Sequence, residues 1–360
     1  MNKKNKKTKY YVNGSNLKSF CCEIFKELDL NEENANIISD SLIESNLRGV
    51  DTHGFTRLSI YVKRLEEGLI NKCPEIKINQ ITPSTAVADG DNGPGQVVGT
   101  KAIEKAISMA RKSGVGLVAV KHSNHFGAAA YYVQRAIKED MIGIAFTNSE
   151  PSMIPFGGKK AFFGTNPISI GIPAGKELPI IVDMATSKVT RGNILMASKN
   201  NLDIPEGWAV DKNGEPTTIA ENALNGALIP LAGPKGYCLA VIVEVFSSLL
   251  SSSSFGPHIN SMYNNFENTQ NVGHFLGAID ISGFCSKEGF KVNIDKMIRE
   301  IKVVTPQRGF IEVYLPGELE SRKKENRLQN GIPLTQNEKY ELEELATKYN
   351  KEDKLIINLR

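Results

Sequence analysis

The sequence contains few cysteines, little net charge and no long apolar run. Its five cysteines are odd in number and include no C-x-x-C pair, which argues against a disulfide-stapled secreted fold and against a cysteine zinc site. We expect these cysteines to be buried as small hydrophobic residues. They are Cys21, Cys22, Cys73, Cys238 and Cys285.

Membrane-spanning and secretory segments are also missing. The best apolar run, residues 238–243, stops at Glu244 and is far shorter than a membrane span. Polar residues follow the basic N-terminus, where a signal peptide would have its apolar core. We therefore expect a cytoplasmic protein that does not bind a membrane.

The net charge is small and unevenly placed. The 360 residues carry 43 Lys and Arg against 40 Asp and Glu, a net charge of +3. Several lysines crowd into the first nine residues, so the rest of the chain is slightly acidic. We expect residues 1–15 to form a flexible basic tail, and we expect no nucleic-acid-binding face on the folded body.

The hydrophobic periodicity changes along the chain. Helical spacing predicts helices over about 17–28, 31–47 and 56–67, and from residue 76 short strands alternate with helices. Such alternation is typical of an α/β domain. The apolar stretch 236–250 is expected to be a buried helix.

A dinucleotide-binding pattern occurs in an unsuitable place. Residues 114–119 read GVGLVA and match G-x-G-x-x-A, the loose Rossmann fingerprint. That fingerprint requires a strand before the glycines and a helix after them, whereas here a helix over 96–112 precedes and a strand follows. Gly114 is therefore expected to end the helix. The G-x-x-x-x-G-K-[ST] phosphate loop is absent from the sequence.

Two short segments carry histidines suited to catalysis. His53 and Arg57 are four residues apart and share one face if a helix has begun by His53. Arginine binds carboxylates through a planar fork, and histidine exchanges protons near neutral pH. A capping histidine beside a solvated arginine is the alternative.

The second histidine segment, residues 122–127, follows a predicted strand. Ligands of α/β proteins bind at such strand ends, so His125 is a candidate catalytic or binding residue, with a structural histidine as the alternative. His122 and His125 have no third ligand nearby, so no metal site is expected.

Further polar loops end other predicted strands. They are rich in Gly, Pro, Asn and Thr, which bring backbone N–H groups close to a ligand. Each alone can be an ordinary turn, but together they form a polar rim. They cover residues 147–149, 155–158, 164–167, 183–187 and 233–236.

This combination resembles the malate/L-lactate dehydrogenase family, NAD(P)-dependent oxidoreductases that lack a Rossmann fold. The resemblance extends from about residue 16 to residue 318. The matching motifs are RGVDTHG (48–54), SNHFG (123–127), TNSEPSMIPFGG (147–158), GTNP (164–167), DMATS (183–187), IPEGWAV (204–210), GPKGY (233–237) and YLPGE (314–318).

The resemblance implies an α/β fold: a non-Rossmann cofactor domain with a largely antiparallel sheet, plus a helical domain from both chain ends. It also implies a homodimer whose active site lies between the two domains. The expected parts are the tail over 1–15, an N-terminal helical part of the substrate and dimer domain over 16–75, the nicotinamide cofactor domain over 76–305, and a helical segment over 306–360 that packs back on the N-terminal part.

The resemblance also implies roles for particular residues. His53 and His125 match proton-transfer histidines, and Arg57 matches the arginine that binds the substrate carboxylate. We favour His125 as the donor, because its loop follows a central strand whereas His53 lies next to Arg57. Thr52 replaces the family's usual serine in the substrate site, and Cys238 replaces a glycine. The residues that match cofactor-contacting positions are Ser149, Asp183, Met184, Ala185, Thr186, Ser187, Lys235, Gly317, Glu318 and Leu319.

The expected reaction is hydride transfer between NAD(P)H and a small 2-oxo or 2-hydroxy acid, most simply malate or L-lactate. Ureidoglycolate dehydrogenase or another family specialist is the alternative enzyme. A non-catalytic dinucleotide- or nucleic-acid-binding protein is the remote one. NAD is the expected cofactor, and NADP is possible if Lys188 and Arg191 bind its 2′-phosphate.

Overall fold

The computed structural model describes residues 10–359, apart from the side chain of Lys199. The chain forms two compact units, one made of the residues up to Gly68 and from Glu318 onwards, the other of Leu69–Gly317. From the sequence, the first division was predicted later, at 75/76, and the second was predicted earlier, at 305/306. Most of the predicted basic tail, residues 1–9, lies outside the described residues.

The first unit combines helices from both ends of the chain with a small antiparallel sheet of order β12-β1-β13. Residues 10–15, which the sequence assigned to the flexible tail, instead form β1 and the start of α1, because Asn13 caps α1 through its side chain. The elements are β1 (Tyr10–Val12), α1 (Gly14–Glu27), α2 (Glu32–Leu47), α3 (Leu58–Glu66), α10 (Glu318–Asn330), β12 (Ile332–Leu334), α11 (Gln336–Lys348) and β13 (Ile357–Leu359).

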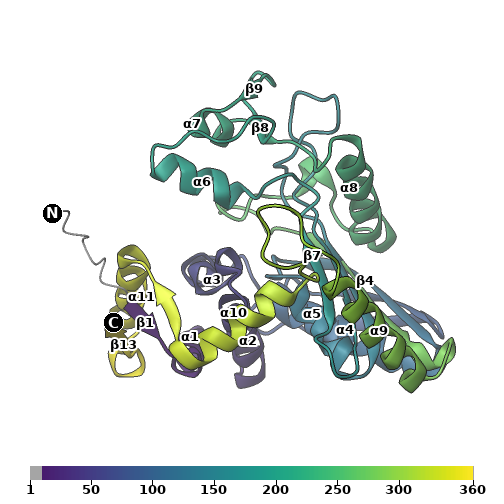
Figure 1. Ribbon diagram of the computed structural model, residues 1–360. Helices are drawn as coiled ribbons and strands as arrows, with labels where there is room; N and C mark the ends of the chain where they lie inside the picture. Colours follow the sequence, from purple (N-terminus) through teal and green to yellow (C-terminus); the bar gives the residue numbers. More distant parts are fainter. Residues whose placement is uncertain (1–9, 360) are drawn as a thin grey trace. The chain divides into compact units, whose positions relative to one another are not determined.

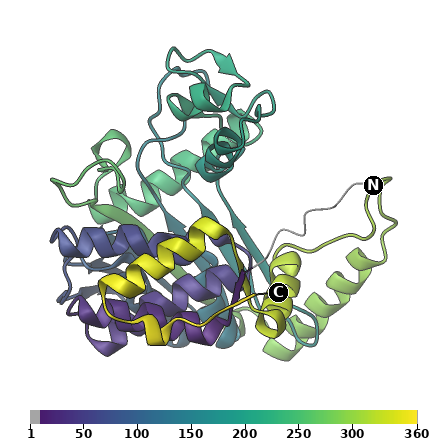
Figure 2. The same ribbon diagram turned by 90° about the vertical axis from the view of Figure 1, so that its left-hand side faces the viewer.

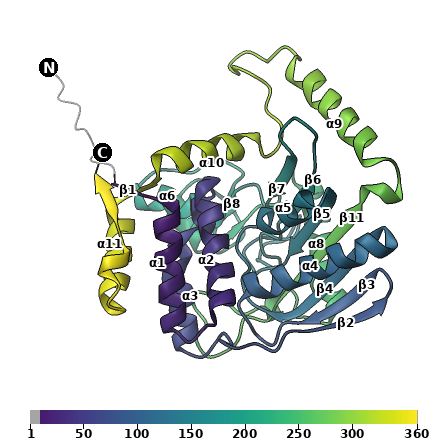
Figure 3. The same ribbon diagram turned by 90° about the horizontal axis from the view of Figure 1, so that it is seen from below.

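Helices α1 and α2 pack side by side (Figure 3). Their facing apolar side chains, among them Phe20, Ile24 and Leu42, are fully buried. Helix α10 joins them from the C-terminal end of the chain, where Lys324 Nζ lies 2.7 Å from a carboxylate oxygen of Glu44. The two ends of the chain thus belong to one compact unit.

The second unit is built on a seven-stranded sheet of order β2-β3-β4-β11-β5-β6-β7, whose strands are labelled in Figure 3. Every neighbouring pair is antiparallel except β3 with β4, so the sheet is largely antiparallel, as expected. The mixed α/β class is confirmed. The strands are β2 (Lys77–Thr82), β3 (Thr85–Asp89), β4 (Val115–Ser123), β5 (Met141–Thr147), β6 (Ile168–Ile172), β7 (Ile180–Met184) and β11 (Val272–Asp280).

Helices cover both faces of this sheet. Successive side chains of a strand point to opposite faces. On β11, Leu276 enters the core shared with α4 (Gly95–Ser113) and α5 (Ala130–Lys138). Its neighbour Phe275 contacts Phe246 of α8 (Pro234–Ser247), with ring centroids 4.9 Å apart. Helix α8 therefore lies on the face opposite α4 and α5.

The G-x-G-x-x-A pattern occurs at a helix-to-strand turn, as predicted. Gly114 ends α4 with a left-handed φ of 81°, and its N–H donates to the carbonyl of Ala110 at 2.8 Å. Strand β4 begins at the next residue, so no helix follows the glycines. This turn is a helix C-terminus, not a phosphate-binding loop.

Helix α8 is only partly buried, contrary to the sequence prediction. Its buried positions repeat at helical spacing along one side, so the other side faces solvent: Ile242 is 45% exposed and Cys238 is also exposed. An apolar composition alone did not reveal this one-sided packing. The prediction of buried cysteines is likewise wrong for Cys73 and Cys285, which are exposed free thiols.

Within the described residues, one stretch, Pro234–Ser251, is long and apolar enough by composition to span a membrane, and 39% of it is buried in the structure. Core helices of soluble proteins pass the same test. The absence of membrane binding therefore stays a prediction.

Two further parts of the second unit were not recognised, or only partly recognised, from the sequence. A lobe containing a small sheet of order β10-β8-β9 stands apart from the main sheet (Figure 1). After α9 (Lys287–Lys302), the chain extends away from the sheet (Figure 2), with Val303 80% and Ile311 93% exposed. The elements of the lobe are α6 (Arg191–Lys199), β8 (Ala209–Val210), β9 (Pro216–Thr217), α7 (Ala220–Leu224) and β10 (Ala227–Leu228).

Candidate active site

The His53 segment consists of two short turns. Residues Asp51–His53 and Phe55–Arg57 form separate 3-10 turns, and α3 begins at Leu58, close to the predicted helix start at residue 56. The condition for a shared helix face, a helix begun by His53, is therefore not met. Gly54 interrupts the helix with an extended backbone that lies close to Asn46, where a Cβ would come within 2.1 Å of the Asn46 side-chain oxygen. The same oxygen accepts a hydrogen bond from the N–H of Phe55 at 2.8 Å.

These turns nevertheless bring the three predicted substrate-site residues together. Arg57 Nε donates to the carbonyl of Thr52 at 2.6 Å, and Thr52 Oγ1 lies 3.0 Å from His53 Nδ1. Burial, followed by the charge of Arg57, lowers the pKa of His53 to about 4. The imidazole is therefore neutral at pH 7, and it can accept or donate a hydrogen bond without a charge of its own.

An ion pair from the C-terminal part of the chain holds this segment. Arg327 of α10 binds both carboxylate oxygens of Asp51, at 2.6 and 3.0 Å, and also donates to the carbonyl of Asn46. Asn46 Nδ2 donates to the same carboxylate at 2.9 Å. The position of the turns thus depends on contacts remote in sequence.

In the second unit, the His125 loop leaves the end of β4 and is held on several sides. The N–H of His125 donates to Gln270 Oε1 at 2.9 Å, and Gln270 is 3% exposed. Asn124 Nδ2 lies within 3.1 Å of three acceptors on Asn92 and Gly93. The loop backbone is therefore fixed, while the His125 side chain is half-buried.

Aromatic packing fixes the next residue of the loop. The Phe126 ring stacks on His274 at 4.4 Å and on Tyr132 at 4.6 Å between centroids. The Tyr132 hydroxyl also donates to the Phe126 carbonyl at 2.5 Å. The ring and the carbonyl of Phe126 thus secure the exit of the loop into α5.

Two of the predicted cofactor residues are joined by a shared neighbour. Ser149 Oγ accepts from the N–H of Thr165 at 3.2 Å, and the Thr165 carbonyl accepts from both the N–H and the hydroxyl of Thr186, at 2.9 and 3.0 Å. Ser187 is buried and donates to the Val189 carbonyl at 2.7 Å, so its hydroxyl has a structural partner.

Lys235 lies beside this cluster at the start of α8. The carbonyl of Thr186 accepts from the N–H of Leu231 at 2.8 Å, which ties the two loops together. Lys235 is exposed, and no side chain caps the N-terminus of this 14-residue helix. Pro234 has no N–H and the Gly236 N–H already donates to the Leu231 carbonyl at 2.8 Å, so Lys235 supplies both the remaining N–H of the first turn and an ammonium group. Together with the helix dipole these groups form a positive site that fits the diphosphate of a dinucleotide.

The remaining predicted cofactor residues lie around β7 and the end of the second unit. Asp183 Oδ2 accepts from the N–H of Ala130 at 3.1 Å, at the first residue of α5 and five residues after His125. Met184 and Ala185, the next residues along the chain, are half-buried. Asp183 thereby links the end of β7 to the start of α5.

Gly317 ends the second unit in a left-handed conformation, with φ 87°. It lies so close to Ile181 that a Cβ added to Gly317 would be 2.9 Å from the Ile181 Cβ. The adjoining Pro316 carbonyl accepts from Ile181 N–H at 3.0 Å. Glu318 opens α10 in the first unit and pairs with Arg322 at 2.6 Å, whereas Leu319 is 51% exposed. The division between the units therefore falls within the predicted Gly317–Leu319 motif.

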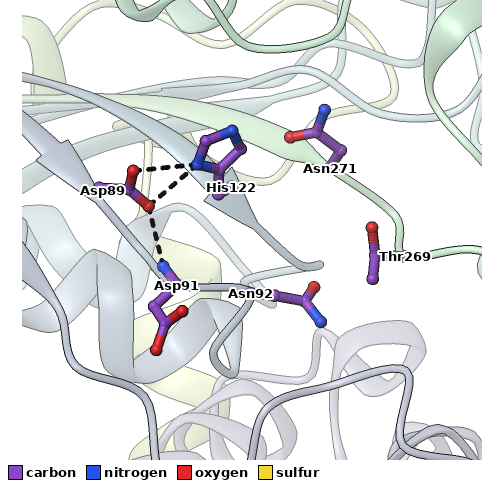
Figure 4. Close-up of a pocket in the computed structure, with 6 residues that line it drawn as sticks. All are labelled: Asp89, Asp91, Asn92, His122, Thr269 and Asn271. Atoms are coloured by element: carbon purple, nitrogen blue, oxygen red, sulfur yellow. Dashed lines mark hydrogen bonds and ion pairs between the residues drawn. The ribbon is translucent and has the colours of Figure 1, made fainter.

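His122 lines a polar cavity of about 330 Å³ (Figure 4). Its Nδ1 lies 3.0 Å from each carboxylate oxygen of Asp89. Among residues 10–359, no group of three or more His, Cys, Asp and Glu side chains is placed to hold a metal ion. The cavity is lined by Asp89, Asp91, Asn92, His122, Thr269 and Asn271.

Sequence reasoning missed the buried polar residues that support these loops. Glu244, Gln270 and His274 are 5%, 3% and 0% exposed. A signal was available for two of them: Glu244 is the one acidic residue in the apolar stretch 238–247, and His274 stands in the apolar strand VGHFLGAI. Buried polar groups need partners, so such isolated residues indicate a hydrogen-bond network.

Glu244 yields a stability prediction. Its carboxylate accepts from Asn148 Nδ2 at 3.1 Å, Asn166 Nδ2 at 2.6 Å and the N–H of Gly256 at 2.9 Å. Asn148 Nδ2 also donates to the Ser254 carbonyl at 2.9 Å and Asn166 Nδ2 to the Ala240 carbonyl at 3.2 Å, so Glu244→Leu removes one acceptor from each amide and the acceptor of the Gly256 N–H. With these buried donors unsatisfied, we expect the free energy of unfolding to fall by about 3–5 kcal/mol. Urea unfolding checks this.

The control is Glu341→Leu on exposed α11, where we expect a change within about 0.5 kcal/mol. Glu244→Gln keeps one acceptor oxygen and should destabilise less than Glu244→Leu. Equal unfolding midpoints for the two leucine variants would contradict this account of the network.

Comparison with known proteins places these motifs in a family. The profile of the malate/L-lactate dehydrogenase family matches residues 12–343. The L-sulfolactate dehydrogenase of Methanocaldococcus jannaschii is 42% identical over 92% of this chain and 95% of its own length, and its solved structure superposes with a TM-score of 0.89 over 94% of this chain and 97% of that one.

Two further relatives differ in substrate. The malate dehydrogenase of Pyrococcus abyssi is 42% identical over 91% of this chain and 92% of its own length. The NAD(+)-dependent ureidoglycolate dehydrogenase of Escherichia coli K12 is 35% identical over 85% and 87%. With a family match over nearly the whole chain and relatives of this identity, the protein belongs to the malate/L-lactate dehydrogenase family of 2-hydroxy acid dehydrogenases.

Proposed function

We propose that the protein transfers hydride between NAD(P)H and a small 2-oxo or 2-hydroxy acid. The observation that carries this proposal is the joined group of Thr52, His53 and Arg57, which sets a guanidinium beside a neutral imidazole. A 2-oxo acid offers a carboxylate for the first and a carbonyl oxygen for the second.

Each side chain has a distinct role in this proposal. Arg57 binds the substrate carboxylate through its planar fork, and Thr52 limits the space beside it. His53, neutral because its pKa is about 4, hydrogen-bonds the carbonyl oxygen. His125, on the loop that follows the central strand β4, donates the proton that completes the alcohol.

The proposed cofactor residues bind and orient a nicotinamide dinucleotide, which supplies or accepts the hydride when bound. Lys235 and the N-terminus of α8 hold the diphosphate, while Ser149, Asp183–Ser187 and Gly317–Leu319 line the remaining contacts. NAD is the proposed cofactor. For NADP, Lys188 is exposed, whereas the Arg191 guanidinium already donates to the Leu224 carbonyl at 3.2 Å.

The names of the relatives help to choose which 2-hydroxy acid we propose as the substrate. Sulfolactate and malate, named for two relatives, both carry a second acidic group besides the carboxylate next to the hydroxyl. They support malate or sulfolactate over lactate as the substrate. Ureidoglycolate is the alternative, because a relative acting on it is also similar.

A panel of 2-oxo acids tested with NADH and with NADPH checks the proposed function. We expect oxidation of the reduced cofactor with oxaloacetate or 3-sulfopyruvate, a higher kcat/KM than with pyruvate, and a preference for NADH. Pyruvate preferred over both dianionic acids would overturn the substrate proposal. No turnover with any 2-oxo acid would overturn the proposed function and revive a non-catalytic role.

We further propose that the protein is a cytoplasmic homodimer. The exposed side of α8 and the residues that follow it support a contact with a second copy, because Ile242, Leu249 and Leu250 are each about half exposed. Sedimentation of the wild type and of Ile242→Glu tests this. A monomeric wild type would overturn it.

A further inference from the structure

His274 joins two loops of the proposed site from inside the second unit. It lies near the start of β11, the strand between β4 and β5, and its side chain is fully buried. Its Nε2 lies 2.8 Å from Ser123 Oγ at the end of β4, and its Nδ1 lies 2.7 Å from Thr147 Oγ1 at the end of β5. One imidazole therefore spans the ends of two strands.

The two partners lead directly to proposed site residues. Ser123 is two residues before His125, and Thr147 is two residues before Ser149. The imidazole also stacks on Phe126, whose ring is 13° from parallel. His274 is therefore bonded to one loop through a hydroxyl and a ring, and to the other loop through a hydroxyl.

The hydrogen-bond partners define the state of the ring. Thr147 Oγ1 can donate to the Gly273 carbonyl at 3.1 Å, which leaves it to accept from Nδ1–H. Ser123 Oγ then donates to Nε2, since its other acceptor, the Asn124 carbonyl, is 3.5 Å away. A neutral imidazole protonated on Nδ1 satisfies these groups, and one protonated on Nε2, with Thr147 donating to Nδ1, makes the same two bonds, so both hydroxyl bonds are compatible with a neutral ring. Burial also favours the neutral ring, because it lowers the pKa of His274 to about 3.

We propose that His274 is a positioning residue that sets the His125 loop and the Ser149 loop at a fixed spacing. The inference rests on the proposed function, in which His125 donates the proton and Ser149 contacts the cofactor. Without the bond to Ser123, the proton donor loses its alignment. Without the bond to Thr147, the Ser149 loop is no longer held in the position that contacts the cofactor. The two bonds thus serve different steps.

Two amide variants separate the bonds. Asparagine carries its amide at the distance of Nδ1, so His274→Asn keeps the bond to Thr147 and loses the bond to Ser123. Glutamine reaches the position of Nε2, so His274→Gln keeps Ser123 and loses Thr147. Matched variants on the partners are Ser123→Ala and Thr147→Val.

We expect each variant to change a different quantity. His274→Asn should lower kcat by about 10- to 100-fold with the cofactor Kd within about twofold of wild type, because a small displacement of a catalytic group has that cost. His274→Gln should weaken NADH binding by about tenfold, measured by calorimetry, with a smaller effect on kcat. Ser123→Ala should reproduce the asparagine result, and adding it to His274→Asn should change little.

A structural control comes from the adjacent residue. Phe275→Leu perturbs the same strand on the face toward α8, so it should lower Tm without separating kcat from cofactor affinity. The inference is overturned if His274→Asn and His274→Gln change kcat and NADH affinity alike, or lower only Tm as Phe275→Leu does. A wild type that binds NADH but reduces no 2-oxo acid would instead contradict the proposed function, and the calorimetric comparison would still test the bond to Thr147.

Discussion

His125→Ala is expected to lower kcat for 2-oxo acid reduction by about 10²- to 10⁴-fold, the range typical of a lost general acid. The backbone of this loop is held by Gln270 and Asn124, so removal of the imidazole should leave the loop in place. Cofactor affinity should therefore change little. Steady-state kinetics with the best acid of the panel, and calorimetry with NADH, measure the two quantities.

The matched control is His122→Ala, three residues earlier. The His122 side chain is exposed and already pairs with Asp89, so we expect kcat within about twofold of wild type. Full turnover by His125→Ala, or an equal loss in both variants, would show that His125 is not the proton donor.

Arg57→Lys is expected to lower kcat/KM for the acid by about 10²- to 10³-fold, although the positive charge is kept. Lysine cannot provide the two parallel N–H donors that a carboxylate accepts from a guanidinium. It also loses the Nε bond to the Thr52 carbonyl that orients the side chain. Kinetics with the acid varied at saturating cofactor measure the loss.

Two comparisons make the Arg57 result specific. Arg299→Lys changes an exposed arginine that pairs with Glu177 at 3.1 Å, and we expect no change in kcat/KM. Arg57→Ala should be partly rescued by added guanidinium. An unchanged kcat/KM in Arg57→Lys would exclude Arg57 as the group that binds the carboxylate.

The elements of the fold were predictable where periodicity and turn chemistry agreed. The helix that ends at Gly114 and the strand after it follow from the apolar spacing of 96–112 and from a glycine in the left-handed region. The strand β1 was not predictable, because its partners β12 and β13 lie at the other end of the chain. Three-residue strands carry too little pattern to identify their neighbours.

The candidate site was predictable for residues whose chemistry is visible in the sequence. His53, Arg57 and His125 stand in polar motifs, and the structure joins His53 to Arg57 through Thr52. The sequence left open how they are held, and the structure places His53 and Arg57 in two turns separated by Gly54 and not on one helix face. That break depends on contact with Asn46 of α2, which no local pattern encodes.

The supporting residues were hidden for a related reason. His274 and Glu244 act through partners on other strands and loops, so their roles depend on tertiary contacts. A lone polar residue in an apolar run indicates that such partners exist, but not which ones. Similarly, α8 was expected to be buried because its composition is apolar all round, whereas only one side packs.

Isotope transfer tests whether hydride passes directly from the cofactor to carbon 2 of the acid. The enzyme is supplied with reduced nicotinamide cofactor deuterated at C4 on the transferred side, together with the best 2-oxo acid, and the product is analysed by mass spectrometry and NMR. The account predicts one deuterium at C2 of the 2-hydroxy acid and none from solvent. A product without deuterium from either face of the cofactor, or no 2-hydroxy acid at all, would contradict it.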